Sequence, residues 1–268
     1  AEALKDGFKE VKETKLLTNN LIQKLQIKIE GNNAGFRKQS GTALKNEQTG
    51  EIIYTPPQKY AQILDYMENL ETFMHEDPAS DHDPLIKMAI IHHQFESIHP
   101  FLDGNGRTGR IINILYLVQK DLLDTPILYL SRYINQNKSE YYRLLQLVRD
   151  RNSWEEWIIF MLEGVRQTSY QTIGLIKAMK ALMLKYKNKI RTELPKIYSQ
   201  VLLNNLFSHP YTKISIVEKE LRIHRNTASK YLTMLSDIGL LTPHKIRNDV
   251  FFLNDDLFNL FHNVGTIS

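Results

Sequence analysis

The chain has 268 residues and a net charge of +4; 42% of its residues are hydrophobic and none is cysteine. This length gives room for one large domain or two ordinary ones, and the missing cysteines exclude disulfides and thiolate metal sites. No apolar run is long enough to cross a membrane and no charged-then-apolar leader opens the chain, so we expect a soluble protein without a membrane partner. We expect it in the reducing cytoplasm, although a cysteine-poor secreted chain would have the same composition.

Helices are predicted through most of the first part of the sequence. Apolar residues recur there at spacings of three and four, the period of a helix packed on a core. The stripes are Tyr60, Ile63, Leu64, Met67, Leu70 and Met74; Ile111, Leu115 and Val118; Leu144, Leu145 and Val148; and Trp154, Trp157, Ile158 and Met161. The predicted fold class is therefore mainly α.

One turn-rich segment, Gly35 to Pro57, interrupts the helices. It leads into a short β-prone run, Glu51 to Thr55, and stops at a double proline, which predicts a small hairpin. The apolar residues Ile52, Ile53 and Tyr54 either pack on the helices or form an exposed clamp.

The C-terminal part follows a different pattern and is basic. Residues 165–268 carry 15 basic and 7 acidic side chains, against 19 and 23 in residues 1–164. A lysine-rich helical connector is followed by two short helical patterns, a turn containing Asn248-Asp249 and a strand-like run. This order is typical of a winged helix-turn-helix. We predict a first domain over 1–164, with its core at about 31–164, a connector over 165–194 and a winged helix over 195–268.

The basic end indicates a polyanionic partner such as DNA, although a solvated lysine-rich face is the commoner explanation of such a bias. The second of the two helical patterns buries one apolar face. Four polar residues lie off that face and are the candidates for DNA contacts: Arg225, Asn226, Ser229 and Lys230.

The stretch HPFLDGNGRTGR, residues 99–110, buries almost nothing and predicts a binding site. Pro100 ends the preceding helix, so the histidine before it faces a loop. The run Gly104 to Gly106 tolerates unusual backbone angles, so successive N–H groups converge in an anion nest at the start of the next helix. Arg107 and Arg110 share one face of that helix, which fits two or three phosphate groups.

Asp103 adds a carboxylate beside the phosphate site, the usual arrangement for holding Mg²⁺. His99 is the nearby group suited to accept a proton near pH 7. Base, metal and phosphate cradle together predict phosphoryl or nucleotidyl transfer, with the nucleophile supplied by the substrate.

Other interpretations of the stretch explain less. An EF-hand loop starting at Asp103 would find Ile114 where a bidentate acid is needed, and no P-loop sequence is present. His92, Glu96 and His99 lie at helical spacing and could bind a transition metal, but the glycines and arginines would then have no purpose. A glycine-rich turn with surface arginines remains an open alternative.

The stretch resembles the signature of Fic-domain proteins, H-x-F-x-[DE]-G-N-G-R-x-x-R. Eight positions match: His99, Phe101, Asp103, Gly104, Asn105, Gly106, Arg107 and Arg110. Phe95-Glu96, Gly35 to Arg37 and Pro56-Pro57 are also similar to the family, and the C-terminal part is similar to the winged-helix appendage of many bacterial Fic proteins. The resemblance implies a Fic-type helical bundle with a β-hairpin flap.

The resemblance further implies transfer of AMP from ATP to a Ser, Thr or Tyr hydroxyl of a target protein. His99 would deprotonate that hydroxyl, which attacks the α-phosphate and expels pyrophosphate, while Asp103 would hold Mg²⁺. Arg107 and Arg110 would bind the β- and γ-phosphates. The other nucleotide-binding residues would be Gly104, Asn105 with its side-chain amide, Gly106, Thr108, Gly109 and Tyr142.

The flap and one tyrosine complete the site that the resemblance implies. Flap residues would pin the target by strand pairing; these are Glu51, Ile52, Ile53 and Tyr54. Tyr142 falls where the family has an adenine-contacting tyrosine, and a packed helix tyrosine is the alternative. Phe101 would anchor the loop in the core. A homodimer is left open.

Many Fic proteins restrain themselves with a helix bearing [ST]-x-x-x-E-[GN], whose glutamate pairs with the second motif arginine, here Arg110. We find no full match; Thr72 to Asp77 comes nearest, but it ends in Asp and follows the flap. Because the chain opens at Ala1 without a methionine, we hypothesise that the restraining helix lies upstream or on another protein.

Two functions are therefore considered. The first is an ATP- and Mg²⁺-dependent protein adenylyltransferase with the winged helix as a recruiting module. The second is a DNA-binding regulator whose Fic core serves as a nucleotide sensor. The intact motif favours AMP transfer over AMP removal or transfer of another phosphate-containing group.

Overall fold

The computed structural model describes residues 2–45, 49–75, 82–247 and 249–266, and the chain divides into two compact units, Ala1–Ser169 and Tyr170–Ser268. Among the helices of these described residues, none combines the length and the apolar character needed to cross a membrane.

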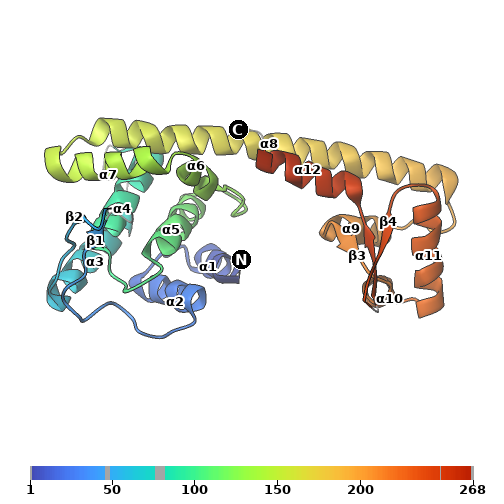
Figure 1. The fold of residues 1–268 in the computed structure, drawn as a ribbon, viewed down its shortest axis with the longest axis horizontal. Helices are drawn as coiled ribbons and strands as arrows, with labels where there is room; N and C mark the ends of the chain where they lie inside the picture. Colours follow the sequence, from blue (N-terminus) through green and yellow to red (C-terminus); the bar gives the residue numbers. More distant parts are fainter. Residues whose placement is uncertain (1, 46–48, 76–81, 248, 267–268) are drawn as a thin grey trace. The chain divides into compact units, whose positions relative to one another are not determined.

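The N-terminal unit is a bundle of helices with one small hairpin (Figure 1). Its helices are α1 (Glu2–Thr14), α2 (Asn19–Glu30), α3 (Tyr60–His75), α4 (Pro84–Ile98), α5 (Asn105–Gln119), α6 (Leu130–Gln136), α7 (Lys138–Arg151) and the first part of α8 (Trp154–Glu193). The expectation of a mainly helical protein with a small hairpin is confirmed.

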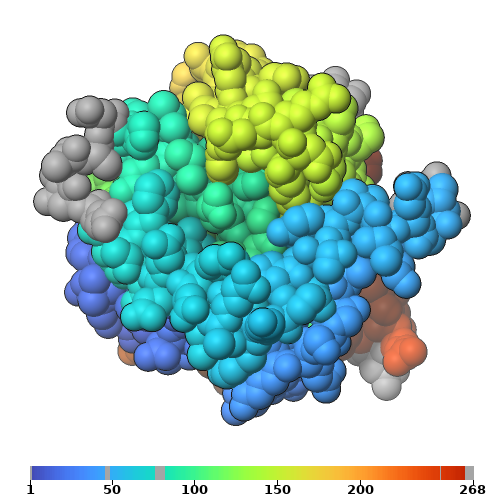
Figure 2. Space-filling view, turned by 90° about the vertical axis from the view of Figure 1, so that its left-hand side faces the viewer, coloured from blue at the N-terminus to red at the C-terminus, as the bar shows by residue number. Residues whose placement is uncertain are grey.

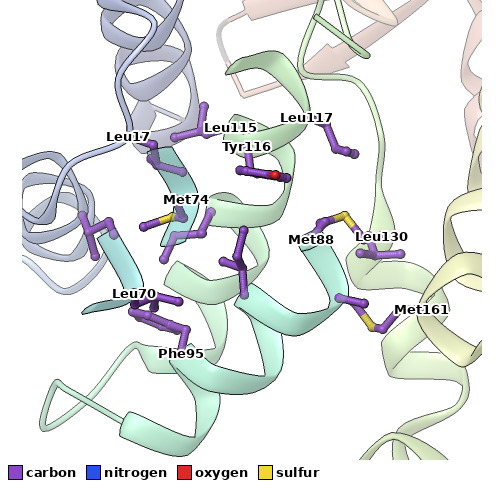
Figure 3. Packing of buried hydrophobic residues seen from close by; sticks show 14 of the residues in the cluster. Leu17, Leu70, Met74, Met88, Phe95, Leu115, Tyr116, Leu117, Leu130 and Met161 are labelled. Carbon is purple, nitrogen blue, oxygen red and sulfur yellow. The ribbon is translucent and has the colours of Figure 1, made fainter. Parts of the chain in front are cut away.

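Helix α5 is central to this unit, since it contacts α1, α2 and α4. Its residues Ile112, Leu115 and Tyr116 are fully buried. Figure 3 shows part of this core, to which α3, α4, α6, α8 and the segment before α2 also contribute side chains. The predicted apolar stripes face this core for the most part, but Tyr60 and Leu64 of α3 are exposed at its outer edge.

Local sequence signals fix the ends of the helices that lead to the motif. Asp83 caps α4, because its side chain accepts a hydrogen bond from the N–H of Leu85 at 2.8 Å, and Pro84 occupies the first turn, where no N–H is needed. Thr18 caps α2 in the same way, and Gly31 ends it with φ = 71°, a left-handed angle that glycine adopts without strain.

The start of α8 is fastened to α4 by a buried tryptophan. The indole N–H of Trp157 donates to the carbonyl of Ala89 at 2.8 Å. The rings of His92 and His93 lie against the same indole, with centroids 6.0 and 5.6 Å away. Both histidines are buried, so this aromatic cluster holds the middle of α4 in place.

The segment before α3 forms the predicted hairpin. Strand β1 (Leu44–Lys45) pairs antiparallel with β2 (Ile52–Tyr54), with Leu44 opposite Tyr54 and Lys45 opposite Ile52. Residues 46–48 lie outside the described part of the chain. We call residues 37–57 the flap segment.

The C-terminal unit combines helices with a three-stranded antiparallel sheet of order β3-β5-β4. Its elements after α8 are α9 (Gln200–Ser208), β3 (Tyr211–Thr212), α10 (Ile214–Leu221), α11 (Arg225–Asp237), β4 (Thr242–Ile246), β5 (Asp249–Leu253) and α12 (Asp255–Thr266). Asn248, part of the predicted turn, lies outside the described residues.

The last part of α8 belongs to the core of this second unit. Tyr186 is buried, and its hydroxyl lies 3.0 Å from the carbonyl of Leu240 and 2.8 Å from Oδ1 of Asn254. The amide of Asn254 donates in turn to the carbonyl of Leu206. The stretch that we expected to be a connector, 165–194, therefore supplies core residues rather than only spacing.

Candidate active site

His99 stands at the C-terminal end of α4. Its backbone has φ = 48° and ψ = 59°, a left-handed conformation that is uncommon for histidine, and its N–H donates to the carbonyl of Phe95 at 3.0 Å. The helix therefore turns sharply at the residue that carries the imidazole. As predicted, Pro100 follows directly and the chain enters a loop.

Phe101 anchors the loop in the core, as expected. Its side chain is fully buried, and its ring lies 5.2 Å from that of Phe36 and 6.3 Å from that of Phe95. Phe101 therefore anchors the loop between α4 and α5 from its core side, and the polar residues of the loop are left at the surface.

Gly104 begins the predicted nest. It is the cap residue of α5, with φ = 82°, and no side chain caps the first turn. The N–H groups of that turn therefore remain available for an anion at the positive end of the helix. Asp103, which is exposed, accepts a hydrogen bond from the N–H of Gly104 at 2.7 Å through one carboxylate oxygen.

Asn105 links the start of α5 to the backbone of the preceding loop. Its side-chain oxygen accepts from the N–H of Phe101 at 2.9 Å, and its amide donates to the carbonyl of Phe101 at 2.8 Å. The side chain is buried and both of its polar atoms are used. It closes the loop, and the expected contact of its amide with a phosphate stays a prediction.

Thr108 and Gly109 are buried in α5, and their expected contacts with the nucleotide stay a prediction. Gly109 faces α4. A Cβ on Gly109 would lie 2.6 Å from Glu96 Oε1 and 3.1 Å from a ring carbon of Phe95. Glycine is therefore required here so that the two helices can approach closely.

The two arginines of the motif lie at different depths. Arg107 is exposed, whereas Arg110 is half-buried. A Cβ on Gly106 would lie 3.3 Å from Nη1 of Arg110, so this guanidinium lies against the nest. Arg110 also acts electrostatically on the buried carboxyl of Glu96 from the neighbouring helix.

A carboxylate from α2 lies in the cradle. Nη2 of Arg107 is 2.5 Å from Oε1 of Glu30, and the Glu30 side chain is only 11% exposed. A Cβ on Gly104 would collide with the same carboxylate. Gln26, one turn earlier on α2, donates to the carbonyl of Asp103 at 3.3 Å. The Glu30 carboxylate therefore pairs with Arg107 and lies against Gly104, at the edge of the nest.

The structure does not test the hypothesis that a restraining helix lies upstream or on another protein, but it places a carboxylate of this chain, Glu30, beside the first motif arginine, Arg107. The sequence signal was QIKIEG, in which Glu30 and Gly31 stand at the expected positions and Gln26 replaces the Ser or Thr. That first position departs from the pattern, so the sequence alone did not single out this helix. The segment that was nearest by sequence, Thr72 to Asp77, ends in residues that lie outside the described part.

The flap residues divide into exposed and attached ones. Glu51, Ile52 and Ile53 are exposed, which fits a clamp and not packing on the helices. Tyr54 is half-buried: its hydroxyl donates to the carbonyl of Ser97 at 3.0 Å, and the Arg149 guanidinium lies 3.8 Å from its ring centre. Figure 2 shows the face on which the flap segment, in light blue, lies.

Tyr142 of α7 is exposed and contacts the ring of its neighbour Tyr141 edge-on at 5.3 Å. The packed tyrosine of this helix is Tyr141, which is buried against Trp157 and Phe160. The alternative of a packed role for Tyr142 is therefore wrong, and its contact with adenine stays a prediction.

The imidazole of His99 is neutral at pH 7. Its pKa is lowered to about 4, first by burial and then by the nearby cations Arg37 and Arg149, while the Glu96 carbonyl and Asp103 act in the opposite direction. A neutral imidazole is the form that accepts a proton. The residue therefore meets the chemical requirement for a general base.

His92 does not form a metal site with His99. Its Nε2 lies 2.9 Å from the hydroxyl of Tyr141 and its Nδ1 lies 3.0 Å from the amide of Asn113, so both ring nitrogens are used inside the core. Among the described residues, no group of three histidine or carboxylate side chains is placed to hold a metal ion.

The geometry defines a site with a neutral base at one helix end and an anion cradle at the start of the next helix, six residues later. Such a site suits the transfer of a phosphate-containing group. Residues 16–117 match the model of the Fic/DOC family, and residues 182–257 match that of the C-terminal domain of SoFic-like protein adenylyltransferases. The chain thus contains a Fic/DOC domain followed by a SoFic-like C-terminal domain.

Similar proteins include a probable protein adenylyltransferase of Aquifex aeolicus, 25% identical over 238 residues that cover 84% of this chain and 68% of that protein. The protein adenylyltransferase Fic of Drosophila willistoni is 26% identical over 143 residues, or 51% of this chain and 27% of its own length. A crystal structure of a Fic family protein from Desulfovibrio desulfuricans G20 shares the fold, with a TM-score of 0.53, 19% identity and coverage of 92% and 72% of the two chains.

The buried histidines predict a loss of stability in mild acid. Burial lowers the pKa values of His92, His93 and His99 to about 3, 4 and 4, so the unfolded chain binds more protons than the folded one below pH 6.5. Burial raises the pKa of Glu96 to about 7, so the folded chain binds one proton there that the unfolded chain does not bind. This opposes the effect of the histidines. We expect the free energy of unfolding to fall by about 2 kcal/mol per unit between pH 6 and pH 5.

Urea unfolding followed by tryptophan fluorescence measures this, because both tryptophans belong to the N-terminal unit. His93→Gln removes one of the three titrating rings and should flatten the slope. A free energy of unfolding that is constant or rises as the pH falls from 6 to 5 would contradict the assignment.

Proposed function

We propose that this chain is a protein adenylyltransferase that transfers AMP from ATP to a hydroxyl of a target protein. The observation that carries the proposal is the neutral His99 at the edge of the nest formed at the start of α5. The adenylyltransferases of Aquifex aeolicus and Drosophila willistoni named above support the same activity.

His99 performs the proton transfer in this proposal. Its neutral ring accepts the proton of the target Ser, Thr or Tyr hydroxyl as the oxygen attacks the α-phosphorus. The bond to the bridging oxygen breaks, and pyrophosphate leaves. The left-handed backbone of His99 and the buried ring of Phe101 support this role, because they hold the base at the mouth of the loop.

The nest binds the phosphates. The free N–H groups at the start of α5 and the guanidinium groups of Arg107 and Arg110 supply the positive charge that the triphosphate requires. Asn105 contributes by closing the loop, and Gly109 by letting α4 and α5 approach.

Asp103 is the residue that would hold Mg²⁺. Its carboxylate is exposed at the edge of the nest, and Mg²⁺ is commonly bound by one or two carboxylates together with substrate phosphates. The bound ion would neutralise charge on the triphosphate. The single carboxylate fits this use and would not suffice for a site made of protein ligands alone.

The flap and Tyr142 complete the substrate contacts. Exposed Ile52 and Ile53 are free to pair with an extended segment of the target, while the attachment of Tyr54 keeps the strand beside the base. The exposed ring of Tyr142 is free to stack on adenine.

The activity is tested by incubating the chain with ATP labelled at the α-phosphate and Mg²⁺, with and without cell lysate. We expect label on protein from the native chain and loss of about a hundredfold or more with His99→Ala, since a general base contributes that much. Tyr129→Ala, an exposed residue outside the motif, serves as the matched control. Nucleotide binding without label would favour a nucleotide sensor instead.

Glu30 restrains the site in our proposal. Its carboxylate pairs with Arg107 and fills an anion position that a phosphate of ATP would use. Productive binding therefore requires this side chain to leave. The family resemblance supports this role in part: a glutamate on a restraining helix is the device that many Fic proteins use, but that glutamate pairs with the second motif arginine, here Arg110, whereas Glu30 pairs with Arg107.

Glu30→Gly should raise labelling on the order of tenfold, a typical coupling between competing groups at one site. The control is Glu13→Gly, the same change near the end of the neighbouring helix α1, at an exposed position. Equal labelling by the native chain and Glu30→Gly would remove Glu30 from the mechanism.

A second function concerns the C-terminal unit, which we propose to be a winged helix that binds DNA. The order α9, β3, α10, α11, β4, β5 is the winged-helix order, with α11 as the recognition helix. Arg225, Asn226 and Lys230 are exposed on α11, and Ser229 is half-buried. The β4–β5 hairpin adds three exposed residues that the sequence analysis had not selected: His244, Lys245 and Arg247.

DNA retention should weaken steeply with salt, since each neutralised phosphate releases counterions. The logarithm of the DNA-binding constant should fall as the logarithm of the salt concentration rises. The double substitution Arg225→Ala and Lys230→Ala should make this fall less steep, by about 0.9 in the slope for each phosphate that is no longer neutralised. Lys196→Ala, an exposed lysine outside these elements, is the matched control. Retention that is absent or independent of salt would leave the unit as a protein-recruiting module.

A further inference from the structure

We propose that Arg37 is a positioning residue that fixes the catalytic end of α4 and the flap segment to each other. The inference rests on the proposed function in one respect, the role of His99 as the base. It concerns a residue outside the motif and joins two parts of the site that the mechanism treats separately.

The guanidinium of Arg37 lies among backbone carbonyls at the end of α4. Its Nε donates to the carbonyl of His99 at 2.8 Å, and its Nη2 reaches the carbonyl of Ile98 at 3.5 Å. The backbone N–H of Arg37 donates to the carbonyl of Pro100 at 2.8 Å. Three successive carbonyls around the base are therefore held by one residue.

The same guanidinium closes the base of the flap segment. Nη2 of Arg37 also donates to the carbonyl of Pro57. Arg37 stands before β1 and Pro57 stands after β2, so this bond joins the two ends of the segment that carries the hairpin. A displacement of the flap root would therefore pull on the residues that hold His99.

Burial shows that this contact is part of the interior. Only 2% of Arg37 is exposed, and among the described residues no carboxylate lies within ion-pair distance. A buried cation without a counter-ion needs other partners. The unpaired carbonyls at the negative end of α4 supply them, which explains why the guanidinium is found at this helix end.

A lysine could not replace this arrangement. The planar guanidinium has five donors in a fixed fork, and here it reaches carbonyls on two separate segments at once. An ammonium group is a compact charge on a flexible stem, so it would keep the charge while losing the bridge. Arg37→Lys keeps the charge and loses the bridge, whereas Arg37→Met loses both. Comparing the two variants therefore separates the effect of the bridge from the effect of the charge.

The charge has its own consequence for the imidazole. Arg37 lowers the pKa of His99, as does Arg149 from α7, while Asp103 and the Glu96 carbonyl raise it. Removing the Arg37 charge should therefore raise the pKa of His99. A residue that only supported the fold would leave this titration unchanged.

The experiment measures two properties that require no catalysis. Histidine-ring NMR, with the His99 signal identified by its loss in His99→Ala, follows the titration from pH 8 to pH 4. Hydrogen exchange followed by mass spectrometry reports on peptides that cover residues 49–59 and 95–106. Native chain, Arg37→Lys, Arg37→Met and the control Arg143→Met are compared; Arg143 is an exposed arginine of α7.

We expect Arg37→Met to raise the pKa of His99 by about one unit and to speed exchange in both peptides about tenfold. Arg37→Lys should leave the titration near the native one and still speed exchange, because the bridge to Pro57 is lost. Arg143→Met should change neither. Since both readouts are independent of AMP transfer, failure of the proposed activity would not alter them.

Two results would overturn the proposal. The first is a folded Arg37→Met whose His99 titration and exchange match the native chain. The second, which decides the matter if Arg37→Met does not fold, is native exchange of both peptides in Arg37→Lys.

Discussion

The close approach of α4 to α5 is the contact on which the site depends. It requires Gly109, because any Cβ there would meet Glu96 and Phe95 of the facing helix. With the helices in contact, the loop of six residues between them brings the end of one and the start of the other to the same edge of the unit. The base and the anion nest are therefore near neighbours because of helix packing, and the loop is held by Phe101 and Asn105 and by bonds from Arg37 and Gln26 to its carbonyls.

The two helix ends at this edge carry opposite partial charges, and the chain provides each with a partner of opposite sign. The end of α4 is negative, and a buried arginine, Arg37, donates to its carbonyls. The start of α5 is positive, and the carboxylate of Glu30 lies beside it, against Gly104 and paired with Arg107. The first partner is buried at the root of the flap, whereas the second stands where a substrate would bind. The charge of Arg37 therefore organises the site, whereas in our proposal the charge of Glu30 has to be displaced by the substrate.

The sequence was sufficient for the helical class, the hairpin and the place of the site. Residues 99–110 are a local signal, since the histidine, glycines and arginines act through a short loop and the first turn of one helix. It was not sufficient for the loop-closing bonds of Asn105 or the packing of Gly109 against α4, because the surroundings of a residue at a helix start depend on the helix that packs beside it. The buried face of α5 could only be assigned once α4 was placed against it.

Two further residues depended on contacts distant in sequence. Glu30 lies 77 residues before Arg107, and no periodicity links α2 to the motif. Arg37 belongs to the run Gly35 to Arg37 that is similar to the Fic family, but its partners are carbonyls of residues 57, 98 and 99, which leave no trace in the sequence. Tyr142 and Tyr141 are adjacent in the sequence, and their exposure alone distinguishes them.

Glu30 is the last residue of α2, and this position determines how much of the structure must change for its side chain to leave Arg107. The helix ends at Gly31, whose N–H bonds to the carbonyl of Ile27 at 2.8 Å, while Leu21, Ile22 and Leu25 hold the earlier turns in the core. Unwinding of this final turn breaks that bond and carries the carboxylate away, with the buried turns unchanged. Terminal turns open at a small fraction of the free energy of global unfolding. In the proposed mechanism, the nucleotide therefore competes with the Glu30 carboxylate, and the cost of displacing it is the local fraying of one helix end.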